Sequence, residues 1–145
     1  MRIAILGFGS VGRGIARALL AKDLDITVTG LADSRSGIID AGGIDLAAAL
    51  AQKENGGPCG NAGVSPGDVV AKAEYDVLVE VTPTNVETGE PALGHIREAL
   101  RRGRHVVTSN KGPIALAYPE LRALAEANGV LLKYEATVCG AIPLI

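Results

Sequence analysis

The chain opens with an apolar run that passes directly into three closely spaced glycines, Arg2-Ile3-Ala4-Ile5-Leu6-Gly7-Phe8-Gly9-Ser10-Val11-Gly12. Residues 2–6 have the character of a short buried strand, and the apolar residues between 11 and 22 recur at helical spacing. Glycines between a strand and a helix permit a tight turn and a close backbone approach to a diphosphate, whose charge the free amides of the helix start attract. We therefore predict a dinucleotide site made of Gly7, Phe8, Gly9, Ser10, Val11 and Gly12.

A second β-branched run, residues 26–32, ends at Asp33 and completes a β-α-β unit. Asp33 follows Gly12 by 21 residues, where a carboxylate accepts hydrogen bonds from the adenosine ribose and repels a 2′-phosphate, which favours NAD. Ser34 and Arg35 come next, and the Arg35 guanidinium can instead hold the 2′-phosphate of NADP. The choice between NAD and NADP therefore stays open at this stage.

The rest of the chain continues the alternation of strands and helices. Patterning predicts strands at 75–80, 105–108 and 130–134, and helices at 46–53, 88–102 and 118–127. Asp45 is the expected cap of the first of these helices, while Pro91 falls in the first turn of the second and Gly103 just past its end. Five strands alternating with helices predict an α/β fold, Rossmann-like and doubly wound, with a mainly parallel sheet and helices on both faces.

Composition narrows the classes of partner. Hydrophobic residues make up 48% of the 145 residues and aromatic residues only 3%, and the formal net charge is −2. No basic stretch is long enough to follow a phosphate backbone, so we expect no nucleic acid and no membrane partner. No apolar run approaches the roughly 20 residues of a membrane span, and no signal peptide precedes the first strand, so we expect a cytoplasmic protein. Cys59 and Cys139 are expected to be unpaired thiols.

Two further strand ends carry polar residues at the carboxyl edge of the sheet, where such folds bind ligands. Thr82 and Pro83 follow the strand at 75–80 and are predicted to line the nicotinamide ribose. The strand at 105–108 leads into Ser109-Asn110-Lys111-Gly112-Pro113, where the lysine can reach a reacting carbonyl or the nicotinamide amide. His95 and His105 have no spaced carboxylate or serine partner, which favours a structural role for both.

The last strand leads into Glu135-Ala136-Thr137-Val138-Cys139-Gly140-Ala141-Ile142-Pro143. Together with the glycine cluster and Ser109-Asn110-Lys111-Gly112-Pro113, in this order and spacing, it resembles homoserine dehydrogenase over essentially the whole chain. The resemblance implies interconversion of homoserine and aspartate 4-semialdehyde with NAD(P), a step toward threonine, isoleucine and methionine. It also implies an amino-acid substrate and a homodimer for the full-length protein.

The same resemblance implies roles for individual residues. Lys111 corresponds to a family lysine beside the nicotinamide and the substrate, so we expect it to be catalytic, while Ser109 and Asn110 contact the cofactor. The family's sodium ion would be held by Glu135, Val138, Gly140 and Ile142, and an all-oxygen site suits a hard cation. The family's acid–base lysine lies in a second domain. We therefore expect residues 1–135 to bind dinucleotide and residues 136–145 to begin the connection to a substrate and dimerisation domain that this chain lacks.

Two alternatives use the same first half of the chain. A nucleotide-sensing Rossmann module needs the glycines and Asp33 but has no use for Lys111 or the Glu135 turn. Another NAD(P)-dependent amino-acid dehydrogenase, such as one acting on aspartate, would share the dinucleotide site and differ in substrate.

Overall fold

The strand that opens the chain, β1 (Arg2–Leu6), lies in the middle of the sheet. In the computed structural model, which describes residues 1–138, six strands pair in the order β3-β2-β1-β4-β5-β6. The others are β2 (Thr27–Ala32), β3 (Gly37–Ile39), β4 (Val77–Glu80), β5 (His105–Thr108) and β6 (Leu132–Lys133). All neighbouring pairs are parallel except β2 and β3. The predicted Rossmann-like α/β fold is therefore confirmed.

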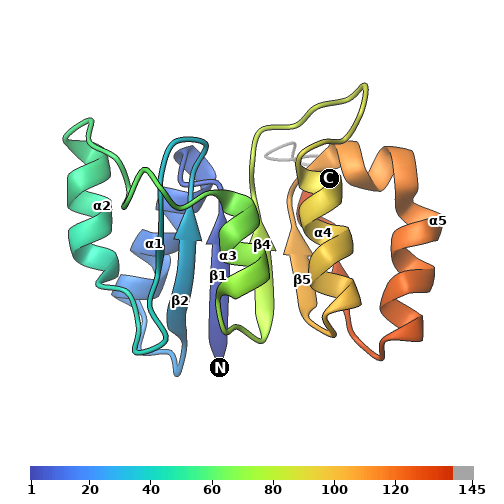
Figure 1. Cartoon of the computed structure of the whole chain (residues 1–145), viewed down its shortest axis with the longest axis horizontal. Coiled ribbons are helices and arrows are strands. Elements are labelled where there is room, and N and C mark those ends of the chain that lie inside the picture. The colour runs from blue at the N-terminus through green and yellow to red at the C-terminus, as the bar shows by residue number, and fades with distance from the viewer. Residues whose placement is uncertain (139–145) are drawn as a thin grey trace, which may run out of the picture.

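Alternating side chains of the strands send apolar groups to both faces of the sheet, as expected for a sheet covered on both sides. Ile3 and Ile5 of β1 belong to one apolar cluster, with α1 (Ser10–Ala21) and α2 (Leu46–Glu54). Ala4 and Leu6 belong to the opposite cluster, with α3 (Pro66–Lys72), α4 (Ala92–Arg101) and α5 (Lys111–Ala127). Figure 1 shows α1 behind the sheet, and α3 and α4 in front of it.

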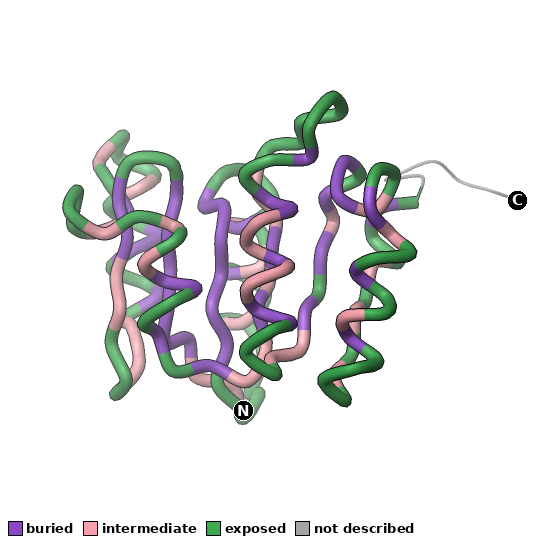
Figure 2. Tube along the Cα trace, turned by 45° about the vertical axis from the view of Figure 1, so that its right-hand side comes forward, coloured by how far each residue is buried: buried purple, intermediate pink, exposed green. Residues whose placement is uncertain are grey.

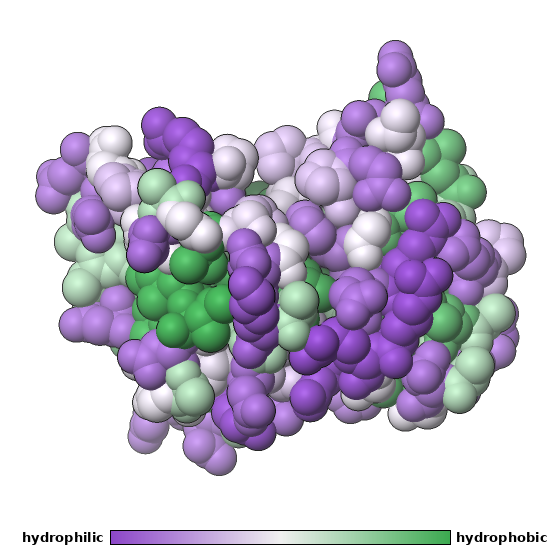
Figure 3. All heavy atoms as spheres, in the orientation of Figure 1, coloured by the Kyte–Doolittle hydropathy of each residue, from purple (hydrophilic) through white to green (hydrophobic). Residues whose placement is uncertain are grey.

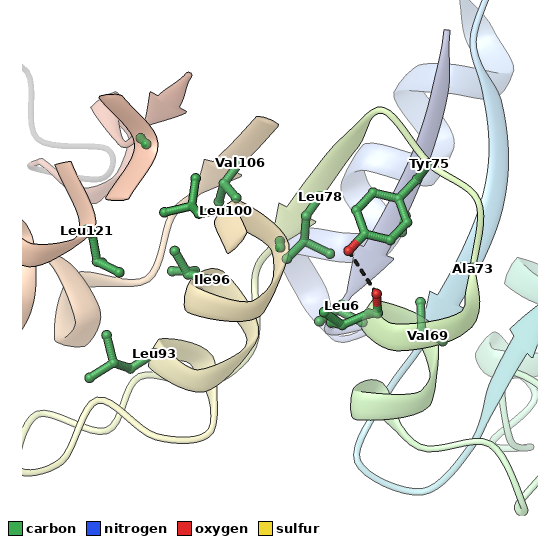
Figure 4. Packing of buried hydrophobic residues seen from close by; sticks show 14 of the residues in the cluster. Leu6, Val69, Ala73, Tyr75, Leu78, Leu93, Ile96, Leu100, Val106 and Leu121 are labelled. Carbon is green, nitrogen blue, oxygen red and sulfur yellow. Dashed lines mark hydrogen bonds between the residues drawn. The ribbon is translucent and has the colours of Figure 1, made fainter. Parts of the chain in front are cut away.

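The larger cluster packs densely around β4 and α4. Figure 4 shows Ile96, Leu100 and Val106 grouped on one side of α4 and Leu78 on the other side, toward the ring of Tyr75, whose hydroxyl reaches the end of α3. The hydroxyl of Tyr75 donates to the Val70 carbonyl at 3.0 Å, so this fully buried phenol has its polar atom satisfied. Truncating a fully buried isoleucine such as Ile96 to alanine typically costs about 2–5 kcal/mol.

The carboxyl ends of the parallel strands meet at one edge of the sheet, and the connection between β4 and α4 rises above it (Figure 1). In Figure 2 the strands run through the middle of the molecule as buried segments, and this connection is exposed. In Figure 3 an apolar area lies between α2 and α3, and much of the remaining surface in that view is polar.

The structure adds two elements that patterning did not predict. β3 has three residues and pairs antiparallel with β2, too short to show a period. α3 has seven residues and begins with a capping box, in which Ser65 accepts from the Asp68 amide and Asp68 accepts from the Ser65 amide. The signal for α3 is thus local, Ser65-Pro66 with an acid three residues after the cap.

Two predicted helix boundaries are wrong. The helix predicted at 88–102 is α4, which begins at Ala92 with Pro91 as its cap, because Asn85 and Gly89 (φ +72°) turn the preceding segment into a loop. The helix predicted at 118–127 begins already at Lys111, where Asn110 caps it through the Gly112 amide. The helix is interrupted at Ala117, whose backbone angles are not helical. Pro119 follows two residues later, and it has no amide hydrogen to donate within the helix.

The remaining expectations match closely. α2 spans Leu46–Glu54 with Asp45 as its cap, as predicted. β4 and β6 are shorter than the predicted strands, and a 3₁₀ turn, η1 (Glu135–Thr137), follows β6. Cys59 is buried as a free thiol, and Cys139 lies outside the described residues.

Candidate functional site

A cavity of about 910 Å³ opens at the carboxyl edge of the sheet, within the size range of small-molecule and cofactor sites. Four segments that follow strands line it: the glycine turn after β1, the loop after β2, the loop after β4 and the segment after β5. Most predicted site residues are among its lining, namely Gly7, Phe8, Gly9, Ser10, Val11, Asp33, Ser34, Arg35, Thr82, Pro83, Ser109 and Lys111. The fold therefore brings these predicted residues together.

The three glycines of the turn differ in what an added Cβ atom would meet. Gly7 has φ +98°, and a Cβ there would lie 2.5 Å from the Val81 carbonyl oxygen. A Cβ at Gly12 would lie 2.0 Å from the Gly7 oxygen, so the turn and α1 could not pack, and Gly12 is buried behind the cavity. A Cβ at Gly9 would meet no protein atom within 4 Å. The space beside Gly9 is thus left open on the cavity side, at the start of α1, as a diphosphate would require.

Asp33 follows β2 and is almost completely buried. Its Oδ1 accepts hydrogen bonds from the Arg35 amide (2.8 Å), the Ser36 amide (2.9 Å) and the Ser36 hydroxyl (3.2 Å). Its Oδ2 is paired with the ammonium of Lys53, which comes from α2. Burial alone would raise the pKa of Asp33, but the Lys53 hydrogen bond and charge and the two amides outweigh it and leave the pKa below its ordinary value.

Lys53 was not among the predicted site residues. It lies 20 residues from Asp33 in sequence, inside a helix that was predicted only as structural, and its side chain is 16% exposed. Because Lys53 compensates the Asp33 charge, the carboxylate repels a nearby phosphate far less than an unpaired one would. Arg35 is exposed beside this pair and lines the same cavity, so two cationic side chains stand at this end.

At the other end, a second buried carboxylate organises the loops after β4 and β5. Glu80 is 0% exposed, and its Oε1 accepts from both the amide (3.0 Å) and the hydroxyl of Thr82. Its Oε2 accepts from the Thr108 hydroxyl at 3.2 Å. Burial raises the pKa of Glu80, and the hydrogen bonds from Thr82, Thr108 and Asn110 offset only part of that rise.

Asn110 links the same two loops from behind the cavity wall. Its Nδ2 donates to the Thr82 carbonyl at 3.1 Å, its amide donates to the Thr108 hydroxyl at 3.0 Å, and its Oδ1 accepts from the Gly112 amide at 3.3 Å. Asn110 is buried and is absent from the cavity lining. It thus acts on the site through the positions of Thr82 and of the first turn of α5.

Lys111 is the first residue of α5, is exposed, and lines the cavity. A cation at a helix N-terminus faces the positive end of the helix dipole, so the helix itself gains nothing from a lysine there. An ammonium at this position could interact with a negative charge or an electron-rich oxygen in the cavity.

Several lining residues were not predicted as part of the site. These residues come from two places. The loop before α4 contributes Thr84, Asn85, Glu90 and Pro91, and η1 contributes Ala136. His95, predicted as structural, also lines the cavity, and its buried Nδ1 has no hydrogen-bond partner within the described residues.

The proposed ion ligands lie elsewhere. Glu135 and Val138 line a separate hollow of about 590 Å³ between α5 and β6, and Gly140 and Ile142 fall outside the described residues. The Glu135 side chain is 75% exposed, with an oxygen 3.6 Å from the Lys133 ammonium. Residues 1–138 contain no group of three or more His, Cys, Asp or Glu side chains placed to hold a metal ion. Over the same residues, no helix is long and apolar enough to cross a bilayer.

Comparison with known proteins gives a consistent result. The family model described as "Homoserine dehydrogenase, NAD binding domain" matches residues 7–135. A homoserine dehydrogenase of Methanocaldococcus jannaschii is 43% identical, with the alignment covering 100% of this chain and 47% of that protein. An NAD(+)-dependent homoserine dehydrogenase of Pseudomonas canavaninivorans is 34% identical over 99% of this chain and 45% of its own length.

Solved structures agree with these matches. A hyperthermophilic archaeal homoserine dehydrogenase in complex with NADPH superposes with a TM-score of 0.78 at 32% identity, covering 94% of this chain and 44% of that one. The chain thus spans about half the length of the curated relatives it matches.

Proposed function

Because this chain belongs to the homoserine dehydrogenase family, in which it matches the NAD-binding domain, we propose that it binds NAD(P) for the interconversion of L-homoserine and L-aspartate 4-semialdehyde. The cavity that joins the glycine turn, Asp33 and Lys111 is the observation that carries this proposal. In the reducing direction, a hydride passes from C4 of the nicotinamide to the aldehyde carbon and a proton adds to the oxygen, giving the homoserine hydroxyl and NAD(P)⁺. The family match disfavours a purely nucleotide-sensing module and an aspartate dehydrogenase.

The cofactor would lie across the cavity in the usual orientation of such folds. Its diphosphate would rest beside Gly9 and the first amides of α1, and its adenosine ribose beside Asp33. The cationic pair Lys53 and Arg35 supports acceptance of the 2′-phosphate of NADP, and the Asp33 carboxylate supports hydrogen bonding to the free ribose hydroxyls of NAD. We propose that both dinucleotides bind.

The nicotinamide half would face Thr82, Pro83 and Ser109, with Lys111 beside the substrate oxygen. An ammonium at that position would orient the carbonyl and stabilise negative charge that develops on its oxygen during hydride transfer. The group that transfers the proton, and most of the substrate pocket, would come from a second domain, to which residues 136–145 would begin the connection. This chain alone would then bind dinucleotide without appreciable turnover.

The test is an assay of the full-length protein with NADH and NADPH against two substrate sets. We expect oxidation of the cofactor with aspartate 4-semialdehyde and none with oxaloacetate plus ammonia. Activity with the second set only would reassign the protein to the amino-acid dehydrogenases.

We also propose, from the family resemblance, a sodium site formed by Glu135, Val138, Gly140 and Ile142. Carboxylate and carbonyl oxygens suit a hard cation, which would act on the position of the η1 turn. The Lys133 ammonium near Glu135 competes with such an ion, so binding should require a cation at appreciable concentration. Glu135→Ala in the full-length protein should weaken any dependence of activity on monovalent cations, and unchanged dependence would remove the site.

The biological setting proposed for the protein follows from the same family. The reaction leads toward threonine, isoleucine and methionine, and the full-length protein would work as a homodimer in the cytoplasm on a free amino acid. Size-exclusion chromatography with light scattering of the full-length protein tests the homodimer.

A further inference from the structure

Glu80 is a fully buried acid at the end of β4 that does not itself line the cavity. Within the described residues its carboxylate makes no salt bridge, and all of its partners are neutral hydroxyl or amide groups. Burying such a group is unfavourable, and an apolar residue would fill the space without that penalty. The position therefore calls for an explanation beyond packing.

The contacts of Glu80 converge on the two loops that form the nicotinamide end. Thr82, which lines the cavity, gives both its amide and its hydroxyl to Oε1. The Ser109 amide donates to the Glu80 carbonyl at 3.3 Å, and Ser109 also lines the cavity. Through Thr108, the carboxylate reaches Asn110, which caps α5 and so places Lys111. The side chain of Glu80 thus joins Thr82 to Thr108 and, through Thr108, to Asn110, while the main-chain carbonyl of Glu80 holds Ser109.

The carboxylate also determines how the Thr82 hydroxyl can interact. Oε1 of Glu80 accepts from both the amide and the hydroxyl of Thr82, so the hydroxyl donates its single hydrogen to Glu80. Its remaining capacity is two lone pairs, one of which accepts from the side-chain Nδ2 of Asn110 at 3.4 Å. Toward the cavity, Thr82 can therefore offer only an acceptor, which matches the donors of a nicotinamide half: the ribose hydroxyls and the carboxamide NH₂.

On the basis of the dinucleotide site proposed above, we propose that Glu80 is a positioning residue for the nicotinamide half of the cofactor. It holds the Thr82 hydroxyl as an acceptor and fixes the loops that carry Ser109 and Lys111. The adenosine end, held by Asp33 and Lys53, does not depend on it, since no hydrogen bond between the two sets is present in the described residues.

The test compares Glu80→Met, which keeps the approximate volume and removes both acceptors, with Glu80→Gln, which keeps one acceptor oxygen for Thr82. Affinities are measured by titration calorimetry with NADH and NADPH, and with ADP, which ends at the diphosphate. Glu80→Met should weaken the binding of NADH and NADPH about tenfold, which corresponds to the loss of roughly one hydrogen bond. The affinity for ADP should stay within about twofold of the wild-type value. Glu80→Gln should recover most of the lost affinity.

A matched control is Asp76→Asn, the same carboxyl-to-amide change at the opposite end of β4, where the side chain accepts from the Arg2 amide at 2.7 Å. It should change none of the three affinities. Thr82→Val removes only the hydroxyl and should reproduce the selective loss, and Glu80→Met with Thr82→Val should be no worse than Glu80→Met alone, because both act through one contact.

Equal weakening of ADP and the dinucleotides by Glu80→Met would show that Glu80 supports only the fold, and would overturn the proposal. Unchanged dinucleotide affinity would overturn it too. If Glu80→Met loses the wild-type thermal transition, Thr82→Val decides: selective weakening supports the proposal and unchanged affinity contradicts it. A wild-type protein that binds neither dinucleotide would instead refute the proposed function, so the two failures are distinguishable.

Discussion

Asp33 and Glu80 are two buried carboxyl groups at the same edge of the sheet, on strands that flank β1 on either side, yet their surroundings differ. Asp33 is paired with Lys53, and its pKa is held below the ordinary value. Glu80 has only neutral donors around it within the described residues, and its pKa is raised. The first arrangement provides a fixed charge pair at the proposed position of the adenosine ribose, and the second provides a fixed set of hydrogen-bond directions at the proposed position of the nicotinamide.

The comparison suggests that the two ends of the cavity do different work. At the proposed adenosine end, charged side chains would contact the dinucleotide, so changes there should act on affinity. At the proposed nicotinamide end, Lys111 would stand beside the reacting carbon, so its loss should act mainly on turnover, whereas changes at Glu80 and Thr82 should lower the affinity for the whole dinucleotides. Variants at each end can separate these two effects.

The largest effect is expected for Lys111→Met in the full-length protein. Loss of a positioned donor beside a developing oxyanion typically lowers kcat about a hundredfold or more, while the affinity for NADPH should change little. Steady-state kinetics with aspartate 4-semialdehyde, combined with NADPH titration, provide the measurement. Lys22→Met, at the exposed end of α1, is the control for loss of one surface charge. If Lys111→Met lowers NADPH affinity as much as it lowers kcat, the proposed difference between the two ends of the cavity is contradicted.

A smaller effect is expected for Lys53→Met at the adenosine end. NADPH affinity should fall about tenfold, because a phosphate loses one charge-assisted partner and meets an uncompensated Asp33, while NADH affinity should fall less. Unfolding free energy should drop by about 2 kcal/mol, less than the typical loss for a completely buried pair because both side chains keep some exposure (16% and 10%).

The control for that variant is Lys72→Met, which removes the exposed pair with Asp68 on α3 and should leave the free energy of unfolding nearly unchanged. Denaturant unfolding and calorimetric titration measure both variants. Equal losses for NADH and NADPH would contradict a role of Lys53 at the 2′ position.

The smallest expected effect is on the pH dependence of stability, to which the two carboxyl groups contribute with opposite sign. The lowered pKa of Asp33 contributes stability that is fully present above its ordinary value of 3.8 and is lost as pH falls toward the folded pKa. The raised pKa of Glu80 works in the opposite direction: stability is gained as pH falls through the folded pKa toward the ordinary value of 4.5. Thermal unfolding from pH 7 down to about pH 3 should therefore show a shallower acid loss in Asp33→Asn and a steeper one in Glu80→Gln. The same slope in both variants would contradict the assignment.

Much of the fold follows from local signals. The glycine turn, the Asp45 cap and the apolar runs predict β1, α1, α2 and β5 closely, because each depends on short-range sequence. β3 and α3 were missed because three and seven residues are too few for a period. The start of α5 was misplaced because Pro119 interrupts its pattern, while the actual cap, Asn110, had been considered only as a ligand contact.

The site was predictable where it follows a strand end and hidden where it depends on tertiary contact. Asp33, Thr82 and Lys111 stand directly after strands, so their meeting at one edge follows from the parallel topology. Lys53 reaches Asp33 from a helix 20 residues away, and no spacing rule indicates that pair. The role of Glu80 is likewise visible only once β4 and β5 are side by side.

The central claim, that this cavity binds a dinucleotide, is tested most directly by titrating NADPH into the wild-type protein and into Gly9→Val. A Cβ at Gly9 meets no protein atom within 4 Å, so the variant should keep the wild-type melting temperature while its side chain fills the space proposed for the diphosphate. We predict saturable binding of one NADPH per chain in the wild type and a loss of affinity of at least about a hundredfold in Gly9→Val, the effect of excluding a diphosphate from its amides. Equal NADPH affinity in the two proteins, or no NADPH binding by the wild type, would contradict the claim that this cavity binds a dinucleotide.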